Sequence, residues 1–156
     1  MGVLTALDES LPAIAWGDPE SRIQELFPGG RSVPGQSYAV LHPLVGYPYP
    51  IALFFGFAPG LRSIQVEYPR TLDLVTGDME FPGRMVAESI YRHLSALLII
   101  AFGGARDPYA DPLPPERSET VLADHTWSNA DTAARLEFRL QSGLGRVRVE
   151  LRSLGA

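Results

Sequence analysis

Three histidines, His42, His93 and His125, are the side chains best able to exchange protons near neutral pH. They occur singly, and no H-x-H or H-E-x-x-H spacing places two of them on one face of a strand or helix. His125 and its neighbour Asp124 would point to opposite faces of a strand, so they cannot pair directly. The sequence therefore predicts no metal site and no catalytic residue.

The stretch AFGGARDPYADP at residues 101–112 contains two glycines, Asp107 and Asp111. A phosphate-binding loop precedes a helix, because the free N–H groups are at the helix N-terminus. Here the glycines follow the most apolar run of the chain. A calcium loop would need glycine where Pro112 stands and a bidentate glutamate where Ser118 stands. We interpret the glycines as the end of a helix and the rest as a surface loop.

The 156-residue chain contains no cysteine and no lysine. The lack of cysteine excludes disulfides, thiolate metal sites and cysteine nucleophiles, and the lack of lysine excludes a Schiff base and a P-loop. Loop carboxylates such as Asp78 with Glu80 have the local spacing of glycosidase acids, but 18 acidic residues produce such pairs by chance. We expect no cofactor.

Residues 135–152 carry the most unusual charge pattern, with five arginines and two glutamates. Arginine is favoured at protein interfaces, so this face is a candidate surface for an acidic partner. The candidate partner-binding residues on it are Arg135, Arg139, Arg146 and Arg148. The alternative is a solvated sheet face on which cross-strand ion pairs neutralise the arginines.

A second candidate surface contains Tyr47 and Tyr49, which lie in a segment stiffened by Pro48 and Pro50. Tyrosine often anchors protein interfaces, because a large apolar ring ends in a polar group. The alternative for both tyrosines is burial in the core. The sequence does not distinguish an interface role of these tyrosines from burial in the core.

Two helices are predicted to position these residues. Residues 84–102 place apolar side chains three and four apart, and Glu88 can pair with Arg92 across one turn. The expected buried stripe is Val86, Ile90, Leu94, Leu97 and Ala101. Residues 18–27 predict a short helix with Asp18 as N-cap and Pro19 in the first turn.

Six strands are predicted, at residues 37–42, 47–57, 61–68, 120–127, 133–141 and 145–152. Proline then glycine at 59–60 predicts a type II turn between the second and third strands. For the last hairpin, a two-residue turn at 142–143 places Glu137 opposite Arg148, whereas a turn at 143–144 opposes like charges. We therefore expect the turn at Ser142 and Gly143.

These elements predict an α+β fold with a mostly antiparallel sheet of about six strands, in the order α-β-β-β-α-β-β-β. The long helix is expected to pack on one face of the sheet. The length fits a single globular domain over residues 1–156. Similar short motifs, such as GDPE at 17–20 and GDME at 77–80, suggest an internal repeat with halves at 17–70 and 77–152.

The net charge of −5 argues against nucleic acid as a partner. The longest apolar run, residues 96–102, is short of the ~20 residues of a membrane span, and no signal peptide is visible, so a cytoplasmic protein is expected. By elimination, the sequence favours a non-catalytic bacterial binding module that is inhibitor-, immunity- or adaptor-like and recognises a protein partner. The alternatives are a small hydrolase that uses a histidine with a loop carboxylate, and a carrier of a small apolar ligand. Open sheet edges also allow a homodimer.

Overall fold

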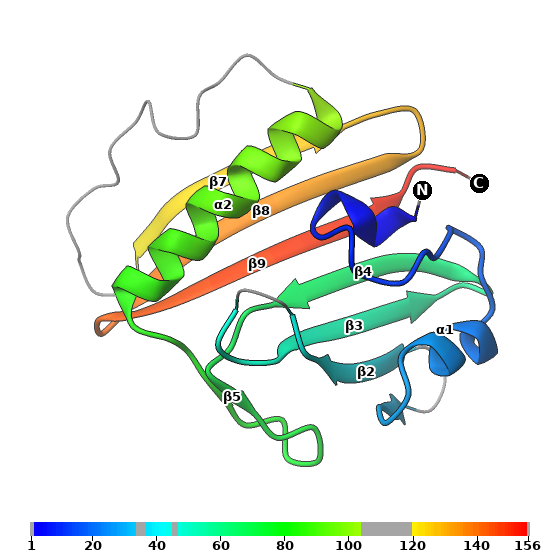
Figure 1. Cartoon of the computed structure of the whole chain (residues 1–156), viewed down its shortest axis with the longest axis horizontal. Coiled ribbons are helices and arrows are strands. Elements are labelled where there is room, and N and C mark those ends of the chain that lie inside the picture. The colour runs from blue at the N-terminus through cyan, green and yellow to red at the C-terminus, as the bar shows by residue number, and fades with distance from the viewer. Residues whose placement is uncertain (1, 34–36, 45–46, 104–119, 156) are drawn as a thin grey trace.

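The centre of the fold is a seven-stranded antiparallel sheet with the strand order β1-β2-β3-β4-β9-β8-β7 (Figure 1). The computed structural model describes residues 2–33, 37–44, 47–103 and 120–155. The strands of this sheet are β1 (Arg31–Val33), β2 (Ser37–His42), β3 (Ile51–Phe57), β4 (Leu61–Glu67), β7 (Thr120–Ser128), β8 (Thr132–Gln141) and β9 (Leu144–Ser153). Two further short strands, β5 (Thr71–Leu72) and β6 (Met79–Glu80), pair only with each other.

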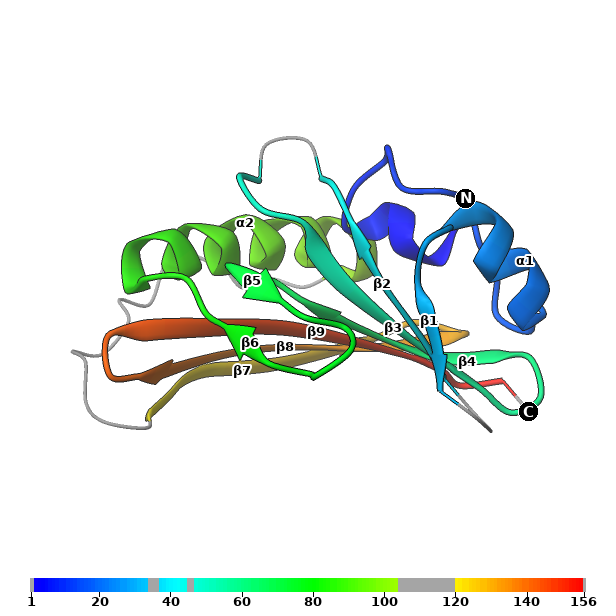
Figure 2. The same cartoon turned by 90° about the horizontal axis from the view of Figure 1, so that it is seen from below.

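The described helices lie on one side of the sheet, which we call the helix face (Figure 2). They are η1 (Val3–Ala6), α1 (Glu20–Leu26) and α2 (Arg84–Phe102). Most contacts of α2 with the sheet are with β8 and β9. The other side, which we call the open face, has no helix over it among the described residues. The predicted α+β class, antiparallel sheet and helix packed on one face are confirmed.

The helix α2 has the predicted bounds but a different buried stripe. Its side chains against the sheet are Ala87, Tyr91, Leu94, Ser95 and Leu98. Of the predicted stripe only Leu94 is buried, and Ile100 is 81% exposed. The helix is apolar nearly all round after Leu94, so periodicity did not fix which side faces the sheet. A close approach of Ala87 to Gly145 of β9 contributes to the observed orientation.

The predicted helix end is confirmed at Gly103, which has a φ of 81° and donates its N–H to the Ile99 carbonyl at 2.8 Å. The loop that contains Asp107 and Asp111 lies outside the described residues. By length and apolarity, α2 is the one helix in the described part of the chain that could cross a membrane. The core helix of a soluble protein has the same properties, and α2 contacts β8 and β9 here.

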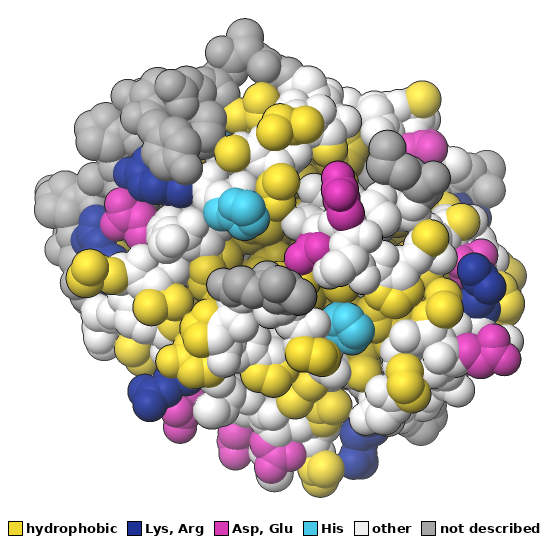
Figure 3. Space-filling view, in the orientation of Figure 1, with side chains coloured by type: hydrophobic (Ala, Val, Ile, Leu, Met, Phe, Trp, Pro, Cys, Tyr) yellow, Lys and Arg dark blue, Asp and Glu magenta, His cyan; other side chains and the backbone are white. Residues whose placement is uncertain are grey.

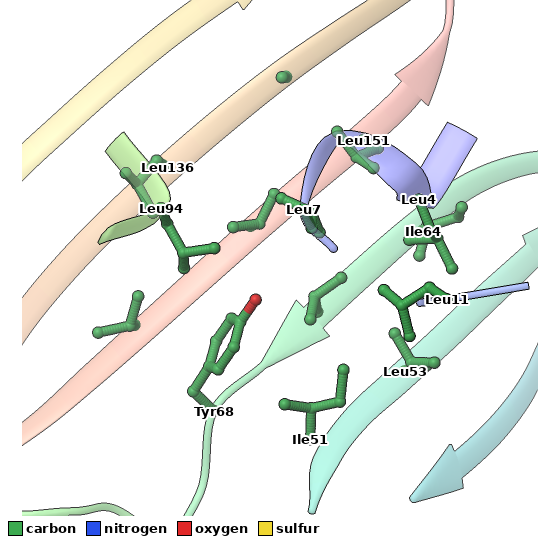
Figure 4. Close-up of a cluster of buried hydrophobic side chains, with 14 of the residues drawn as sticks. Leu4, Leu7, Leu11, Ile51, Leu53, Ile64, Tyr68, Leu94, Leu136 and Leu151 are labelled. Carbon is green, nitrogen blue, oxygen red and sulfur yellow. The ribbon is translucent and has the colours of Figure 1, made fainter. Parts of the chain in front are cut away.

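The N-terminal segment covers the part of the helix face that α2 leaves uncovered. Leu4, Leu7, Leu11 and Ile14 are buried and belong to the same hydrophobic core as the sheet (Figure 4). Figure 4 shows Leu4 and Leu11 over Ile64 of β4 and Leu53 of β3, while Leu94 of α2 lies toward Leu136 of β8. The helix face is therefore covered by two separate pieces of chain.

The β8–β9 hairpin has the predicted register. Gln141 pairs with Leu144, so the turn consists of Ser142 and Gly143, which have φ angles of 51° and 79°. Two positive φ angles fit a type I′ turn. Glu137 lies opposite Arg148, as expected. Cross-strand charge therefore predicted the register correctly.

Two local predictions were wrong. Gly60 does not have a positive φ, so the β3–β4 connection is not a type II turn, and the Ala58–Pro59 peptide bond is cis. Asp18 is not the N-cap of α1, because Pro19 occupies that position. Asp18 instead accepts the Ala15 N–H at 2.9 Å and pairs with Arg22 at 3.3 Å. The short strands β1, β5 and β6 were not predicted, since two or three residues carry no periodic signal.

Gly60 is needed for a close backbone approach. A Cβ atom there would come within 2.8 Å of the Gly17 Cα, at the point where the N-terminal segment hydrogen-bonds to Leu61. We expect Gly60→Ala to lower the free energy of unfolding by about 1–3 kcal/mol, because one backbone must move away from the other. Urea denaturation measures the effect. Gly155→Ala, where a Cβ meets only ordinary contacts, should change it by less than about 0.5 kcal/mol, and equal losses would contradict this account.

Candidate functional site

Two glutamates buried on the open face organise its charged side chains. Glu67 of β4 is 0% exposed and Glu137 of β8 is 3% exposed, although neither points into the hydrophobic core. Each lies in register with Arg148 of β9, which stands between them in the sheet. A buried carboxylate is stable only when cations and hydrogen bonds compensate its lost hydration. Arginines from the same face supply that compensation.

Glu67 is held mainly by Arg146. The guanidinium makes a bidentate contact, with Nη2 2.7 Å from Oε1 and Nε 3.0 Å from Oε2 of Glu67. Gln65 donates a further hydrogen bond to Glu67 at 3.1 Å. The hydrogen bonds and charge of Glu67 raise the pKa of Arg146. The Arg146 guanidinium also lies over the Phe81 ring at 5.4 Å, so its position is fixed from two sides.

Glu137 is shared by three arginines. Its carboxylate oxygens are 2.8 Å from Arg139 Nε, 3.1 Å from Arg135 Nη2 and 3.2 Å from Arg148 Nη2. Arg135 also makes a bidentate contact with Asp124 of β7, and its hydrogen bonds lower the pKa of Asp124. The alternative prediction, a solvated sheet face with cross-strand ion pairs, is therefore correct in part, because arginines and carboxylates on neighbouring strands form ion pairs here.

The ion pairs leave several guanidinium groups of this face exposed to solvent. The Glu137 carboxylate is buried beneath its partners, whereas the Arg139 side chain is 53% exposed. Two more arginines of the face carry exposed or partly exposed charge: Arg135, and Arg152 at the end of β9. Arg152 has no ion pair with any described residue. The solvent thus meets guanidinium groups above the buried carboxylates of Glu67 and Glu137, beside the partly exposed carboxylates of Asp124 and Glu150.

A shallow hollow adjoins these arginines on the open face. It has a volume of about 400 Å³ and is lined by Phe54, Ser63, Gln65, Glu150 and Arg152 among others. Phe54 of β3 points away from the core, and the Ser63 hydroxyl lies against Gly56 on the same strand. On the open face, the apolar side chain of Phe54 therefore lies in the same hollow as the positively charged Arg152.

The structure separates the two surfaces predicted from the sequence. Arg135, Arg139, Arg146 and Arg148 gather on the open face. Tyr47 belongs to the helix face, because its ring contacts Tyr68 at 5.7 Å and its hydroxyl donates to the Pro69 carbonyl at 3.0 Å.

Tyr49 contacts Tyr47 edge-to-face at 5.7 Å. Burial, with the nearby Tyr49, raises the pKa of Tyr47. Tyr47 is partly buried against the core, and Tyr49 is partly buried in contact with Tyr47, so the two tyrosines form no part of the arginine surface.

The three histidines lie in three different environments. His42 contacts Phe27 edge-to-face at 5.2 Å, and burial lowers its pKa. His93 is exposed on α2. His125 of β7 is 2.8 Å from the Tyr91 hydroxyl and stacks on its ring, on the face opposite to Asp124. Within the described ranges no carboxylate lies within 4 Å of His42 or His93, and no group of three potential ligands could hold a metal ion.

No protein-family model matches the chain, and neither a curated protein nor a solved structure matches it. Evidence for a function therefore comes from the geometry and charge of the surfaces described above. The sequence pattern identified the arginines but did not single out Glu67. Strand alternation does place the Glu67 side chain outward, but it cannot show that Glu67 is buried beneath Arg146.

Glu67 should be important for stability although it is outside the hydrophobic core. We expect Glu67→Gln to lower the free energy of unfolding by about 2–4 kcal/mol, because the partly buried Arg146 loses its charged partner. Chemical denaturation at neutral pH measures this. Glu150→Gln is the matched control, since Glu150 is partly exposed and 3.5 Å from Arg148, and it should cost less than about 1 kcal/mol. A similar loss in both variants would show that the buried pair is not special.

Proposed function

We propose that the protein is a non-catalytic, bacterial, cytoplasmic binding module, and that its open face docks an acidic segment of a protein partner. The observation that carries this proposal is the exposed layer of guanidinium groups above the buried carboxylates of Glu67 and Glu137. Complementary charge is a main source of specificity in protein association.

The arginines of this face are pre-organised for carboxylates. Arg135 and Arg146 are held in bidentate contacts, so their side chains are already ordered before a partner arrives. Ordering a long side chain on binding costs about 0.5–1.5 kcal/mol, and this cost is reduced when the free protein has already fixed it. Among the described residues, the face carries five arginines against four carboxylates, which are Glu67, Asp124, Glu137 and Glu150, and the excess of positive charge is available to a carboxylate of the partner.

The hollow at Phe54 adds an apolar contact to the charged one. An aromatic side chain beside a charged rim is typical of the buried centre of an interface. The partner segment that fits best therefore carries an apolar side chain for Phe54 and acidic residues for Arg139 and Arg152. A protein partner is favoured over nucleic acid because the remainder of the chain is acidic.

Charge reversal at Arg139 tests the proposal. A titration of the ¹⁵N-labelled protein with a glutamate-rich peptide containing one leucine should shift amide resonances of β8 and β9 and saturate. We expect Arg139→Glu to weaken this binding by at least about tenfold, which corresponds to ~1.4 kcal/mol. Arg22→Glu on α1 is the matched control, because Arg22 is 50% exposed and carries the same charge, and it should change the affinity less than about twofold.

Several outcomes would contradict the proposal. The open face is not the docking surface if resonance shifts concentrate on α2, or if both reversals weaken binding equally. A protein ligand is wrong if double-stranded DNA binds more tightly than the peptide at the same salt concentration. Retained folding of Arg139→Glu, checked by its denaturation midpoint, excludes a trivial loss of structure.

A further inference from the structure

A pocket on the helix face lies at the seam between α2 and the N-terminal segment (Figure 3). Its volume is about 410 Å³, within the range of ~300–1,000 Å³ that small-molecule sites occupy. Figure 3 shows hydrophobic side chains in this hollow, with histidine and acidic side chains around it. The apolar walls are Leu7, Leu44, Tyr47, Ile90 and Leu94. Four parts of the chain that are distant in sequence therefore meet around one cavity.

Tyr68, directly after β4, presents its hydroxyl to this pocket. Its side chain is 3% exposed, and Figure 4 shows the hydroxyl directed toward Leu7 and Leu94. The hydroxyl has no hydrogen-bond partner among the described residues, unlike that of Tyr47, which donates to the Pro69 carbonyl. No fully buried side-chain polar atom in the described part of the chain lacks a hydrogen-bond partner, so the Tyr68 hydroxyl is in contact with the open pocket. A hydroxyl that faces a cavity without a protein partner is available to a ligand.

Asp8 supplies the charge of the pocket. Its Oδ1 atom accepts hydrogen bonds from the backbone N–H and the hydroxyl of Ser10, both at 2.7 Å. Its Oδ2 atom has no partner among the described residues, and Asp8 lines the pocket together with Tyr68. Burial, with the nearby charges of Tyr47 and Asp8, raises the pKa of Tyr68, so the phenol stays protonated.

Two polar groups at the inner wall of the pocket can only accept hydrogen bonds, whereas Tyr68 and, at its outer part, Ser89 and His93 can also donate. The Asp8 carboxylate only accepts, and the Tyr47 hydroxyl has already donated its proton, so its oxygen can only accept. Tyr68 can accept as well as donate. A ligand group with several N–H donors and a positive charge satisfies this set, whereas a carboxylate would be repelled by Asp8. Aromatic rings beside a carboxylate also favour ammonium groups.

We propose that this pocket binds a small amphiphilic amine, whose apolar body packs against Leu7, Ile90 and Leu94 and whose ammonium group donates to Asp8 and Tyr68. His93 and Ser89 of α2 line the outer part of the pocket and are exposed. The site is on the opposite side of the sheet from the arginines, so this proposal does not depend on partner docking at the open face.

Three ligands of equal chain length test the proposal on the purified full chain. We expect n-octylammonium to bind saturably with a Kd below about 1 mM, and n-octanol and octanoate to bind at least about tenfold more weakly, because neither offers a charged donor. Calorimetry or resonance shifts around Ile90 and Leu94 measure the three affinities. Octanol binding as tightly as the amine, or octanoate binding more tightly, would overturn the proposal.

Two variants separate binding from structure. Asp8→Asn should weaken octylammonium binding at least about tenfold, and Tyr68→Phe about three- to tenfold. Tyr68→Phe should not lower the denaturation midpoint, since the hydroxyl has no protein partner to lose. Tyr49→Phe, outside the pocket lining, is the control and should leave the affinity within about twofold.

Unchanged affinity in Asp8→Asn would overturn the amine site. A destabilised Tyr68→Phe would do the same, because it would show that the hydroxyl has a structural role. Arg139→Glu should bind the amine normally, so that failure at this pocket and failure of partner docking remain distinguishable.

Discussion

One helix cannot cover a sheet of seven strands, and most features of this protein follow from that limit. An α-helix with its side chains is about 10–12 Å wide, whereas seven strands at ~4.8 Å spacing extend over roughly 29 Å. The helix α2 covers β8 and β9, and the N-terminal segment and α1 must cover the rest of the helix face. The helix α2 and the N-terminal segment must therefore meet along a boundary, and the pocket lies at that boundary.

In the described part of the chain, no helix covers the other face of the sheet, which therefore faces solvent. Such a face needs polar side chains, and here they form ion pairs around two carboxylates that have lost most of their hydration. Carboxylates lie beneath guanidinium groups because glutamate is shorter than arginine, so that the longer side chain reaches over it. An acidic protein thereby acquires a local basic surface without a net basic composition.

The sequence predicted the parts of the fold that depend on neighbouring residues. The bounds of α2 follow from its apolar run, and the β8–β9 register follows from opposed charges at Glu137 and Arg148. The pairing of β4 with β9 joins distant segments, and no local pattern encodes it. The candidate sites were harder to predict: alternation places Tyr68 inward, but its missing hydrogen-bond partner and its proximity to Asp8 exist only in the assembled fold.

Glu67 and Tyr68 are consecutive residues, yet their side chains serve opposite sides of the sheet. Glu67 anchors Arg146 on the open face, and Tyr68 lines the pocket on the helix face. A single peptide unit at the end of β4 therefore connects the two surfaces. A molecule that shifts this unit from one side changes the free energy of binding on the other, and thermodynamic reciprocity makes the effect equal in both directions.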